Sequence, residues 1–268
     1  MTYTSTRPPV QYPGGKRQVA TRIVNLIRRS FPEHERLYSP FLGGGAVELR
    51  WSNFTRGEVI AADYDKPLTN LWTWVLLDAP AVAAACLDSV PLDARFWQKN
   101  YPQLYADYYH GTFENAVTYW LLRRIKVPNA WGLSHRILSD FNKKHRGVIN
   151  LLRQFRAPRF HVYHCDFDYF IGSQRKDSLL YCDPPFVGLE DVYMYHKKGQ
   201  PNDAPTFSHQ LLFERLRDKE AWVLSYGDHP WVRETYRDYR LIEVPVKYEN
   251  RRFRDCSPNA RELLIVSR

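Results

Sequence analysis

The chain has 268 residues, 44% of them hydrophobic, which is enough to bury the core of one large domain or of one domain carrying an insertion. It has no apolar run of roughly 18–20 residues and no signal-peptide core, which excludes a membrane protein, so we expect a cytoplasmic one. Its four cysteines lie far apart, with no CxxC pair and no histidine at metal-ligand spacing, which excludes a disulfide framework and a zinc site, so we expect no metal. The net charge of +9 and the 15% aromatic content favour a polyanionic partner and stacking on unpaired bases, although solvated charges and core aromatics would give the same numbers.

The first part of the chain alternates between helix-like and strand-like patterns. Apolar residues recur at helical spacing from Val19 to Ile27, after YPGGK, and RLYSPF then predicts a short strand that enters a glycine turn. A helix is predicted from about Ala46, and EVIAAD (58–63) predicts a second strand. Together these segments indicate a β-loop-α-β unit.

Residues 67–158 have a different pattern, with helices rich in aromatic and basic residues and no convincing strand. We therefore expect them to form a helical insertion, with residues 1–66 and 159–268 forming the main domain. Crossover helices are predicted in SHQLLFERLRDKE, with Ser208 as the N-cap, and in HPWVRETYRD. Further strands are predicted at 159–167, 178–183, 221–228, 240–248 and 260–268.

Strands that alternate with helices predict an α/β fold with a mostly parallel sheet covered on both faces. Ligands on such sheets gather at the carboxyl ends of the strands. One aspartate at a strand end is ordinary turn chemistry, but four at the same edge indicate a shared site. The aspartates at or just past predicted strand ends are Asp63, Asp166, Asp183 and Asp228.

A glycine loop, SPFLGGGAVELRW, lies between the first strand and its helix. Glycines at this place let the backbone pass close under a ligand, but the loop matches neither the P-loop nor GxGxxG. Asp63 follows Gly45 by 18 positions (63 − 45) at the end of the next strand, where an acid suits two ribose hydroxyls. The pair suggests an adenosine-containing ligand without a pyrophosphate, and S-adenosylmethionine fits this description.

The segment DPPF ends another predicted strand with a carboxylate held by two prolines. The amino group of an aromatic base is a poor nucleophile, because its lone pair is delocalised into the ring. The Asp183 carboxylate and the Pro184 carbonyl could accept its two N–H bonds and favour a tetrahedral nitrogen, while Phe186 offers a stacking face. A rigid turn leaving a buried strand is the alternative for the tetrapeptide alone.

Five motifs in this order resemble the alpha-class (D12) DNA N6-adenine methyltransferases, the group of the GATC-methylating enzymes. The resemblance covers residues 11–78 and 159–268. It implies a seven-stranded, Rossmann-like class I S-adenosylmethionine-dependent methyltransferase sheet, with a target-recognition insertion between the second and third strands. It also implies site-specific methylation of a flipped-out adenine in double-stranded DNA, as in restriction-modification. The motifs are YPGGK, SPFLGGGAVEL, AADYDKPLTNLW, HCDF and YCDPPF.

The resemblance also assigns roles to single residues. Asp183, Pro184 and Phe186 look like the catalytic set. The residues that look like S-adenosylmethionine contacts are Tyr12, Lys16, Phe41, Gly43, Asp63, Asp166 and Phe167. Ser39 stands where relatives commonly have an acid, so we expect the contact to the methionine amino group to be weakened or supplied elsewhere.

Several basic residues of the insertion are candidates for holding DNA phosphates, which would offset the cost of about a few kcal/mol for flipping a base. These are Arg123, Arg124, Lys126, Arg136, Lys143 and Lys144, although for each of them alone a solvated surface charge is the more common explanation. Tyr195, in the loop after DPPF, is a candidate for closing over the flipped base. Nothing resembles a dimerisation helix, so a monomer is expected.

Two other functions remain open at this point. One is an S-adenosylmethionine-dependent enzyme that acts on RNA or on N4 of cytosine, since the aspartate before two prolines suits either amine. The other is a DNA-binding relative that no longer catalyses, against which the intact DPPF and Asp63 argue.

Overall fold

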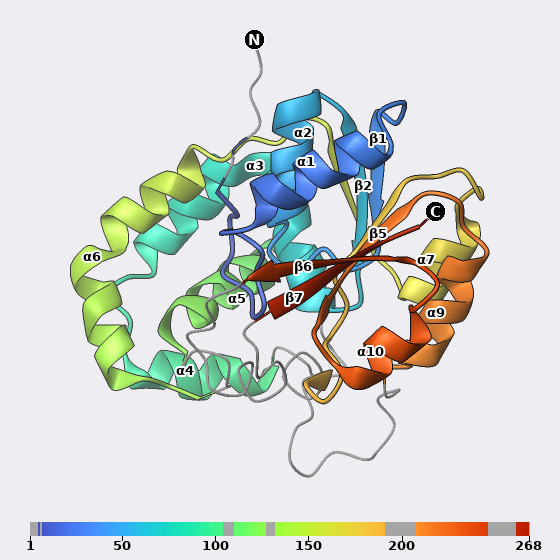
Figure 1. Ribbon diagram of the computed structural model, residues 1–268. Coiled ribbons are helices and arrows are strands. Elements are labelled where there is room, and N and C mark those ends of the chain that lie inside the picture. Colours follow the sequence, from blue (N-terminus) through green and yellow to red (C-terminus); the bar gives the residue numbers. More distant parts are fainter. Residues whose placement is uncertain are drawn as a thin grey trace.

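A computed structural model of the chain describes residues 5, 7–103, 110–126, 132–190, 207–245 and 261–267. Seven strands form one sheet in the order β3-β2-β1-β4-β5-β7-β6 (Figure 1). Their bounds are β1 (Arg36–Ser39), β2 (Glu58–Asp63), β3 (Phe160–His164), β4 (Leu180–Cys182), β5 (Trp222–Gly227), β6 (Arg240–Pro245) and β7 (Arg261–Val266).

The sheet is parallel except for one strand. β1 pairs in parallel with β2 and β4, β2 with β3, and β4 with β5, whereas β7 is antiparallel to both β5 and β6. The last strand of the chain therefore lies inside the sheet, between two strands that precede it. This sheet confirms the predicted α/β class and is the one that the family resemblance implies.

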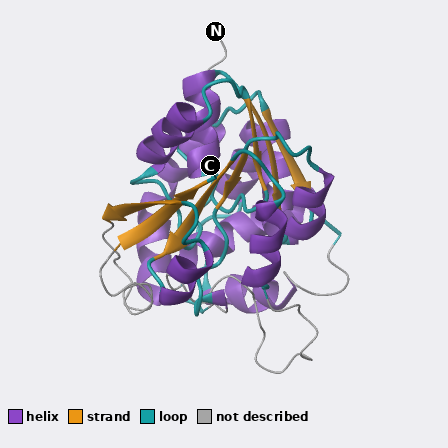
Figure 2. Cartoon of the chain, turned by 45° about the vertical axis from the view of Figure 1, so that its right-hand side comes forward, coloured by secondary structure: helices purple, strands orange, loops and turns teal. Residues whose placement is uncertain are grey.

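Helices lie on both sides of this sheet, as Figures 1 and 2 show. In Figure 1, α4, α5 and α6 lie to the left of the sheet and α7, α9 and α10 to the right. The helices are α1 (Ala20–Ser30), α2 (Ala46–Thr55), α3 (Lys66–Asp88), α4 (Ala94–Asn100), the 3₁₀ turn η1 (Tyr101–Gln103), α5 (Phe113–Ile125), α6 (His135–Arg153), α7 (Phe167–Ser173), α9 (His209–Arg217) and α10 (Pro230–Thr235).

Side chains that alternate along the strands pack into two cores, because successive residues of a strand point to opposite faces of the sheet. On β4, Tyr181 packs with the core of α1, α2, α3, α5 and α6, whereas Leu180 and Cys182 pack with α7, α9 and α10. On β7, Leu264 belongs to the first core and Leu263 to the second. Covered faces explain why these strands are apolar on both sides.

The helical stretch between β2 and β3 is attached to the sheet through α3. This helix begins at Lys66 and is capped by Asp65, whose side chain accepts from Leu68 N; it is interrupted at Asp78, two residues before Pro80. It packs against β3 as well as against α5 and α6. Among the described residues α3 is the one helix long and apolar enough to cross a membrane, but Val75, Val82 and much of its apolar surface are buried in the first core.

Several predicted boundaries are confirmed by local geometry. β2 spans the predicted residues 58–63, and Ser208 caps α9 by accepting from Leu211 N at 3.1 Å. Asp166 ends the segment after β3 and caps α7 by accepting from Asp168 N at 2.8 Å. The turn chemistry of these side chains thus places the predicted site residues at the ends of their strands.

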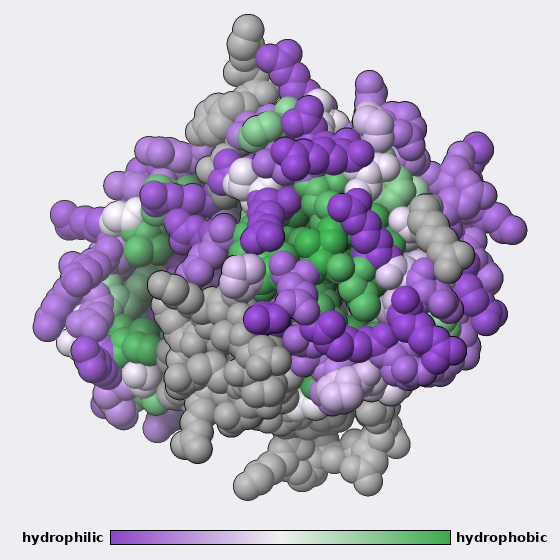
Figure 3. All heavy atoms as spheres, in the orientation of Figure 1, coloured by the Kyte–Doolittle hydropathy of each residue, from purple (hydrophilic) through white to green (hydrophobic). Residues whose placement is uncertain are grey.

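The surface in the orientation of Figure 1 is largely hydrophilic. Figure 3 shows hydrophobic side chains gathered near the middle of this face, over the part where β6 and β7 lie in Figure 1. Leu241 and Ile242 of β6 are half-buried, and they pack on the second and the first core respectively. The antiparallel end of the sheet is therefore less covered than its parallel part.

Candidate active site

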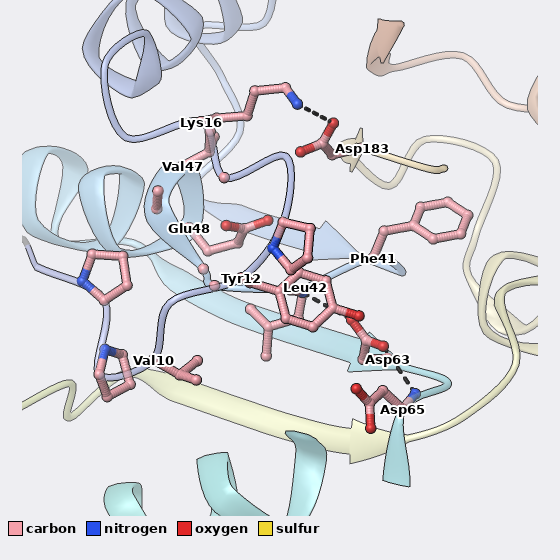
Figure 4. Close-up of a pocket in the computed structure, with 18 of the residues that line it drawn as sticks. Val10, Tyr12, Lys16, Phe41, Leu42, Val47, Glu48, Asp63, Asp65 and Asp183 are labelled. Atoms are coloured by element: carbon pink, nitrogen blue, oxygen red, sulfur yellow. Dashed lines mark hydrogen bonds and ion pairs between the residues drawn. The ribbon is translucent and has the colours of Figure 1, made fainter. Parts of the chain in front are cut away.

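A cavity of about 1220 Å³ lies at the carboxyl ends of β1, β2 and β4. Figure 4 shows Lys16 and Asp183 facing each other on one side, Asp63 and Asp65 on the other, and Tyr12 between the two pairs. This is the sheet edge at which ligands of parallel α/β folds bind. The cavity is lined mainly by the N-terminal segment, the glycine loop and the strand-end carboxylates.

The glycine loop is fixed by the protein itself. Asp63 Oδ2 accepts from Gly43 N at 2.8 Å, and Trp72 Nε1 donates to Gly43 O at 3.0 Å. Trp72 is fully buried and stacks on Phe160 of β3, with ring centroids 5.3 Å apart and planes at 6°. The loop is therefore preorganised before any ligand binds.

Asp63 and Asp65 form the acidic side of the cavity. Asp63 Oδ1 accepts from Asp65 N at 3.0 Å, so both of its oxygens accept a backbone amide. Each carboxylate oxygen has two lone pairs, and capacity for ligand hydroxyls remains. Burial raises the pKa of Asp63, and burial together with the charge of Asp63 raises the pKa of Asp65 to about 7.

The N-terminal segment that borders the cavity is held by α5. Arg123 donates from Nε and Nη2 to Gln11 O at 3.0 and 2.6 Å, and its guanidinium lies 5.0 Å from the ring centroid of Tyr12. Trp120 Nε1 donates to Pro9 O at 2.8 Å. A helix of the insertion thus positions the residues around Tyr12.

Replacing Arg123 with alanine is therefore expected to weaken binding of S-adenosylmethionine, the cofactor that the sequence predicts, about tenfold, because two hydrogen bonds from a charged group fix the Gln11 carbonyl. Isothermal titration with S-adenosylmethionine measures this loss. Arg136→Ala removes an exposed arginine from α6 and should leave the affinity unchanged. Equal affinities of Arg123→Ala and the wild type would contradict the role given to α5.

Three aromatic rings close another part of the cavity. Phe41, Phe167 and Phe207 line it, with centroid separations of 5.5 Å (Phe41–Phe167), 5.7 Å (Phe41–Phe207) and 5.1 Å (Phe167–Phe207). Asp166 also lines this part and is exposed. Phe41, Asp166 and Phe167 were expected cofactor contacts and are brought together, whereas Phe207 had no motif to mark it.

Asp183 follows β4 and pairs with a buried lysine. Lys16 Nζ lies 2.8 Å from Asp183 Oδ1 and donates to Gly14 O at 2.9 Å. The Asp183 side chain is 19% exposed. Burial raises the pKa of Asp183 to about 6, with Lys16 acting in the opposite direction and Glu262 in the same direction.

The rest of DPPF is buried beside this carboxylate. Pro184 is buried, and Phe186 is 3% exposed, with Lys16 Nζ 4.9 Å from its ring centroid. Gly227 lies against the same ring, since a Cβ there would be 3.0 Å from Phe186 Cδ2. The end of β5 at Gly227 therefore packs on DPPF. The expectation that Asp228 joins the shared site is wrong, because it does not line the cavity and binds Arg233 at 2.6 and 2.9 Å.

A buried carboxyl that the sequence did not mark lies in α2. Glu48 is 2% exposed, lines the cavity and accepts from Ser39 Oγ at 2.7 Å. Ser39 is the position at which the family resemblance led us to expect an acid. Burial raises the pKa of Glu48 to about 7, the Ser39 hydrogen bond lowers it, and the charges of Asp183 and Asp63 raise it further.

Replacing Glu48 with glutamine is expected to stabilise the ligand-free protein at pH 8 by about 3 kcal/mol, since one pH unit corresponds to about 1.4 kcal/mol. The Glu48 pKa is about 7 in the folded state against an ordinary 4.5, so folding binds a proton between these values and stability falls as the pH rises through them. At pH 4.5 or below, the two proteins should melt alike. Thermal unfolding at pH 4.5 and pH 8 tests this, and an equal difference at both would contradict it.

The basic residues of the insertion fall into two groups. Arg136, Lys143 and Lys144 are exposed on α6 and stay candidates for phosphate contacts. Arg123 and Lys126 are only 3% and 7% exposed, which corrects the expectation that they hold phosphates. Burial lowers the pKa of Lys126 to about 7, and the charge of Arg123 lowers it further.

Arg124 and Tyr195 were also expected to contact DNA. Arg124 is half-buried and donates to Pro9 O at 3.2 Å, so it also holds the N-terminal segment. Tyr195 lies outside the described residues. Within the described ranges, no group of three His, Cys, Asp or Glu side chains is arranged to hold a metal ion.

Comparison with known proteins gives a consistent result. The model of the family described as D12 class N6 adenine-specific DNA methyltransferase matches residues 12–163 and 136–250. The chain is 29% identical to a protein of Haemophilus influenzae named DNA adenine methylase, over 97% of this chain and 93% of that protein. It is 22% identical to the retron Ec67 DNA adenine methylase of Escherichia coli, over 92% of this chain and 88% of that protein.

Proposed function

This chain belongs to the D12 class of N6 adenine-specific DNA methyltransferases, and from that membership we propose that it transfers the methyl group of S-adenosylmethionine to N6 of an adenine flipped out of a specific site in double-stranded DNA. The observation that carries the proposal is the position of Asp183. Its carboxylate follows β4 at the edge of the cavity that also contains Asp63 and the glycine loop. One cavity therefore joins a place for an adenosine cofactor to an acceptor for an amine.

The residues of the cavity fit this cofactor. S-adenosylmethionine carries a positive sulfonium and an ammonium group, and the cavity is lined by several carboxylates. Asp63 has lone pairs left for ribose hydroxyls, and Phe41 and Phe167 offer faces for the adenine ring beside Asp166. We propose that Glu48 supplies the acid that Ser39 does not, on the methionine side.

The bound cofactor supplies an electrophilic methyl group. The chain contributes the geometry of the amine: Asp183 accepts one N–H of N6, the Pro184 carbonyl accepts the other, and the lone pair is drawn out of conjugation toward the methyl group. The prolines restrict the backbone and so fix the positions of the two acceptor groups. Stacking of the base on Phe186 requires the ring to become accessible, since it is 3% exposed here.

The helical stretch 67–158 is proposed to recognise the target, with residues 1–66 and 159–268 as the catalytic part. Exposed Arg136, Lys143 and Lys144 on α6 would contribute phosphate contacts. All proposed groups of the site come from one chain, so a monomer suffices. We propose that it acts in the cytoplasm. No metal is needed for this reaction, because N6 attacks the methyl group directly.

The experiment that tests the proposal is mass spectrometry of nucleosides from unmethylated DNA of mixed sequence, incubated with the protein and S-adenosylmethionine. N6-methyldeoxyadenosine is the expected product, and sequencing of the modified DNA then gives the site. Methylated RNA adenine or N4-methylcytosine in parallel reactions, without N6-methyldeoxyadenosine, would contradict the proposed substrate. Cofactor binding without any transfer would contradict catalysis.

A further inference from the structure

The ammonium group of Lys16 lies between two carboxylates that come from different parts of the fold. It is 2.8 Å from Asp183 Oδ1, after β4, and 3.7 Å from Glu262 Oε1, on β7. Lys16 and Glu262 are each 4% exposed. Because Glu262 and Leu264 are two residues apart on one strand, they share the sheet face that packs on the first core.

This cluster holds one cation and two anions in a place with little water. Electrostatic interactions are strong in such surroundings. The charge left on Asp183 therefore depends on how the Lys16 ammonium is shared between the two carboxylates. Burial acts to lower the pKa of Lys16, but the two carboxylates outweigh it and raise the pKa overall. The charged and titratable groups that face Asp183 are Lys16 from the N-terminal segment, Glu262 from β7, Glu48 from α2, and Tyr181 and Cys182 from β4.

The proposed reaction moves a positive charge to the amine that Asp183 holds. The nitrogen lone pair forms a bond to the methyl carbon as the carbon–sulfur bond breaks, so the sulfur becomes a neutral thioether and the nitrogen becomes positive. The nitrogen then releases one proton to water. A carboxylate that is fully neutralised by a lysine stabilises this charge poorly. A second carboxylate on the same lysine leaves the cluster with a net negative charge.

We propose that Glu262 is a positioning residue of the methyl-transfer site: it shares the Lys16 ammonium with Asp183, so that the Asp183 carboxylate keeps charge and lone pairs for the target amine. The inference rests on the proposed function. Asp183 touches the amine, and Glu262 acts on it through Lys16. Without Glu262, Lys16 would pair with Asp183 alone.

Glu262→Gln tests this, since it removes the charge and keeps the size. In single-turnover methyl transfer with saturating cofactor and DNA, we expect the rate to fall about 10- to 100-fold, the range found for outer-shell partners that orient metal ligands, with cofactor affinity little changed. The acidic limb of the pH–rate profile should move to lower pH, because the Glu262 charge raises the pKa of Asp183. A rate loss with an unmoved limb, or an unchanged rate, would overturn the proposal.

Matched variants separate this result from other failures. Glu243→Gln removes an exposed carboxylate of the neighbouring strand, which pairs with Arg233 and Arg261, and should change neither the rate nor the limb. Wild-type activity in the same assay tests the proposed function, whereas the ratio of variant to wild type tests the role of Glu262. If Glu262→Gln does not fold, Glu262→Asp keeps the charge and should keep the limb and a rate within about 10-fold of wild type; a larger loss with an unmoved limb would overturn the role of the charge.

Discussion

Replacing Asp183 with alanine is expected to lower the rate of DNA adenine methylation by about 10³-fold, the upper range for removing one preorganised polar group that stabilises charge in a transition state. In the proposed mechanism this carboxylate, at the cavity edge, accepts one of the two N–H bonds of the target amine. Its removal leaves the nitrogen lone pair conjugated with the ring. Single-turnover formation of N6-methyldeoxyadenosine measures the loss.

The wild-type pH profile checks the same carboxylate independently. In the proposed mechanism Asp183 acts as a carboxylate, and burial raises its pKa to about 6, so the rate should fall as the pH drops through about 6. Asp183→Asn keeps the size without the charge and should be nearly as inactive as Asp183→Ala. Asp177→Asn changes an exposed aspartate that pairs with Arg175, and it should retain full activity. A folded Asp183→Ala enzyme with more than a tenth of the wild-type rate would refute the role of Asp183.

The second large effect is expected at the glycine loop, where Gly45→Ala should destabilise the protein by about 2–5 kcal/mol. Gly45 has φ = +71°, which costs an L-residue roughly 1–2 kcal/mol. An added Cβ would also lie 2.7 Å from Trp72 Cζ2, and overpacking a core costs typically about 1–3 kcal/mol. Trp72 has little room to move, because it is fully buried and stacked on Phe160.

Gly44→Ala is the matched control for this substitution. A Cβ at Gly44 would meet its nearest atoms, in Tyr12 and Val10, at 3.5 Å, which is ordinary contact. Urea denaturation of the two variants should show a large loss for Gly45→Ala and a change within about 1 kcal/mol for Gly44→Ala. The displaced loop should also weaken cofactor binding in Gly45→Ala. Equal stability of the two variants would show that the loop adapts to a side chain at Gly45.

Sequence reasoning was effective where the signal is local. β2 has the predicted bounds, Ser208 caps α9, and Asp63 meets the glycine loop through Gly43 N, because each depends on residues close in sequence or on one β-loop-α-β unit. The ordered motifs then identified the family. Roles of single residues within the motifs stay predictions until they are tested.

Contacts between segments distant in the chain could not be predicted from the sequence. Glu262 lies in an apolar strand with no motif around it, and it contacts Lys16 only because β7 inserts between β5 and β6. Arg123 looked like a surface cation, yet it is buried on the Gln11 carbonyl, 112 residues earlier in the chain. Periodicity predicts which face of an element is apolar, but not which charged side chain will find a buried partner.

The place of β7 has a consequence for how the protein is made. Lys16 and Glu262 are 246 positions apart (262 − 16), so at about 5–20 residues per second a ribosome needs roughly 12 to 50 s to add the second after the first. By the time that Pro245 is added, the chain has its glycine loop, Asp63 and Asp183, but it still lacks the strand that joins β5 to β6. The Lys16–Glu262 contact therefore forms only after β7 has been made and inserted between β5 and β6, so the proposed positioning of Asp183 is acquired after the other six strands of the sheet have been synthesised.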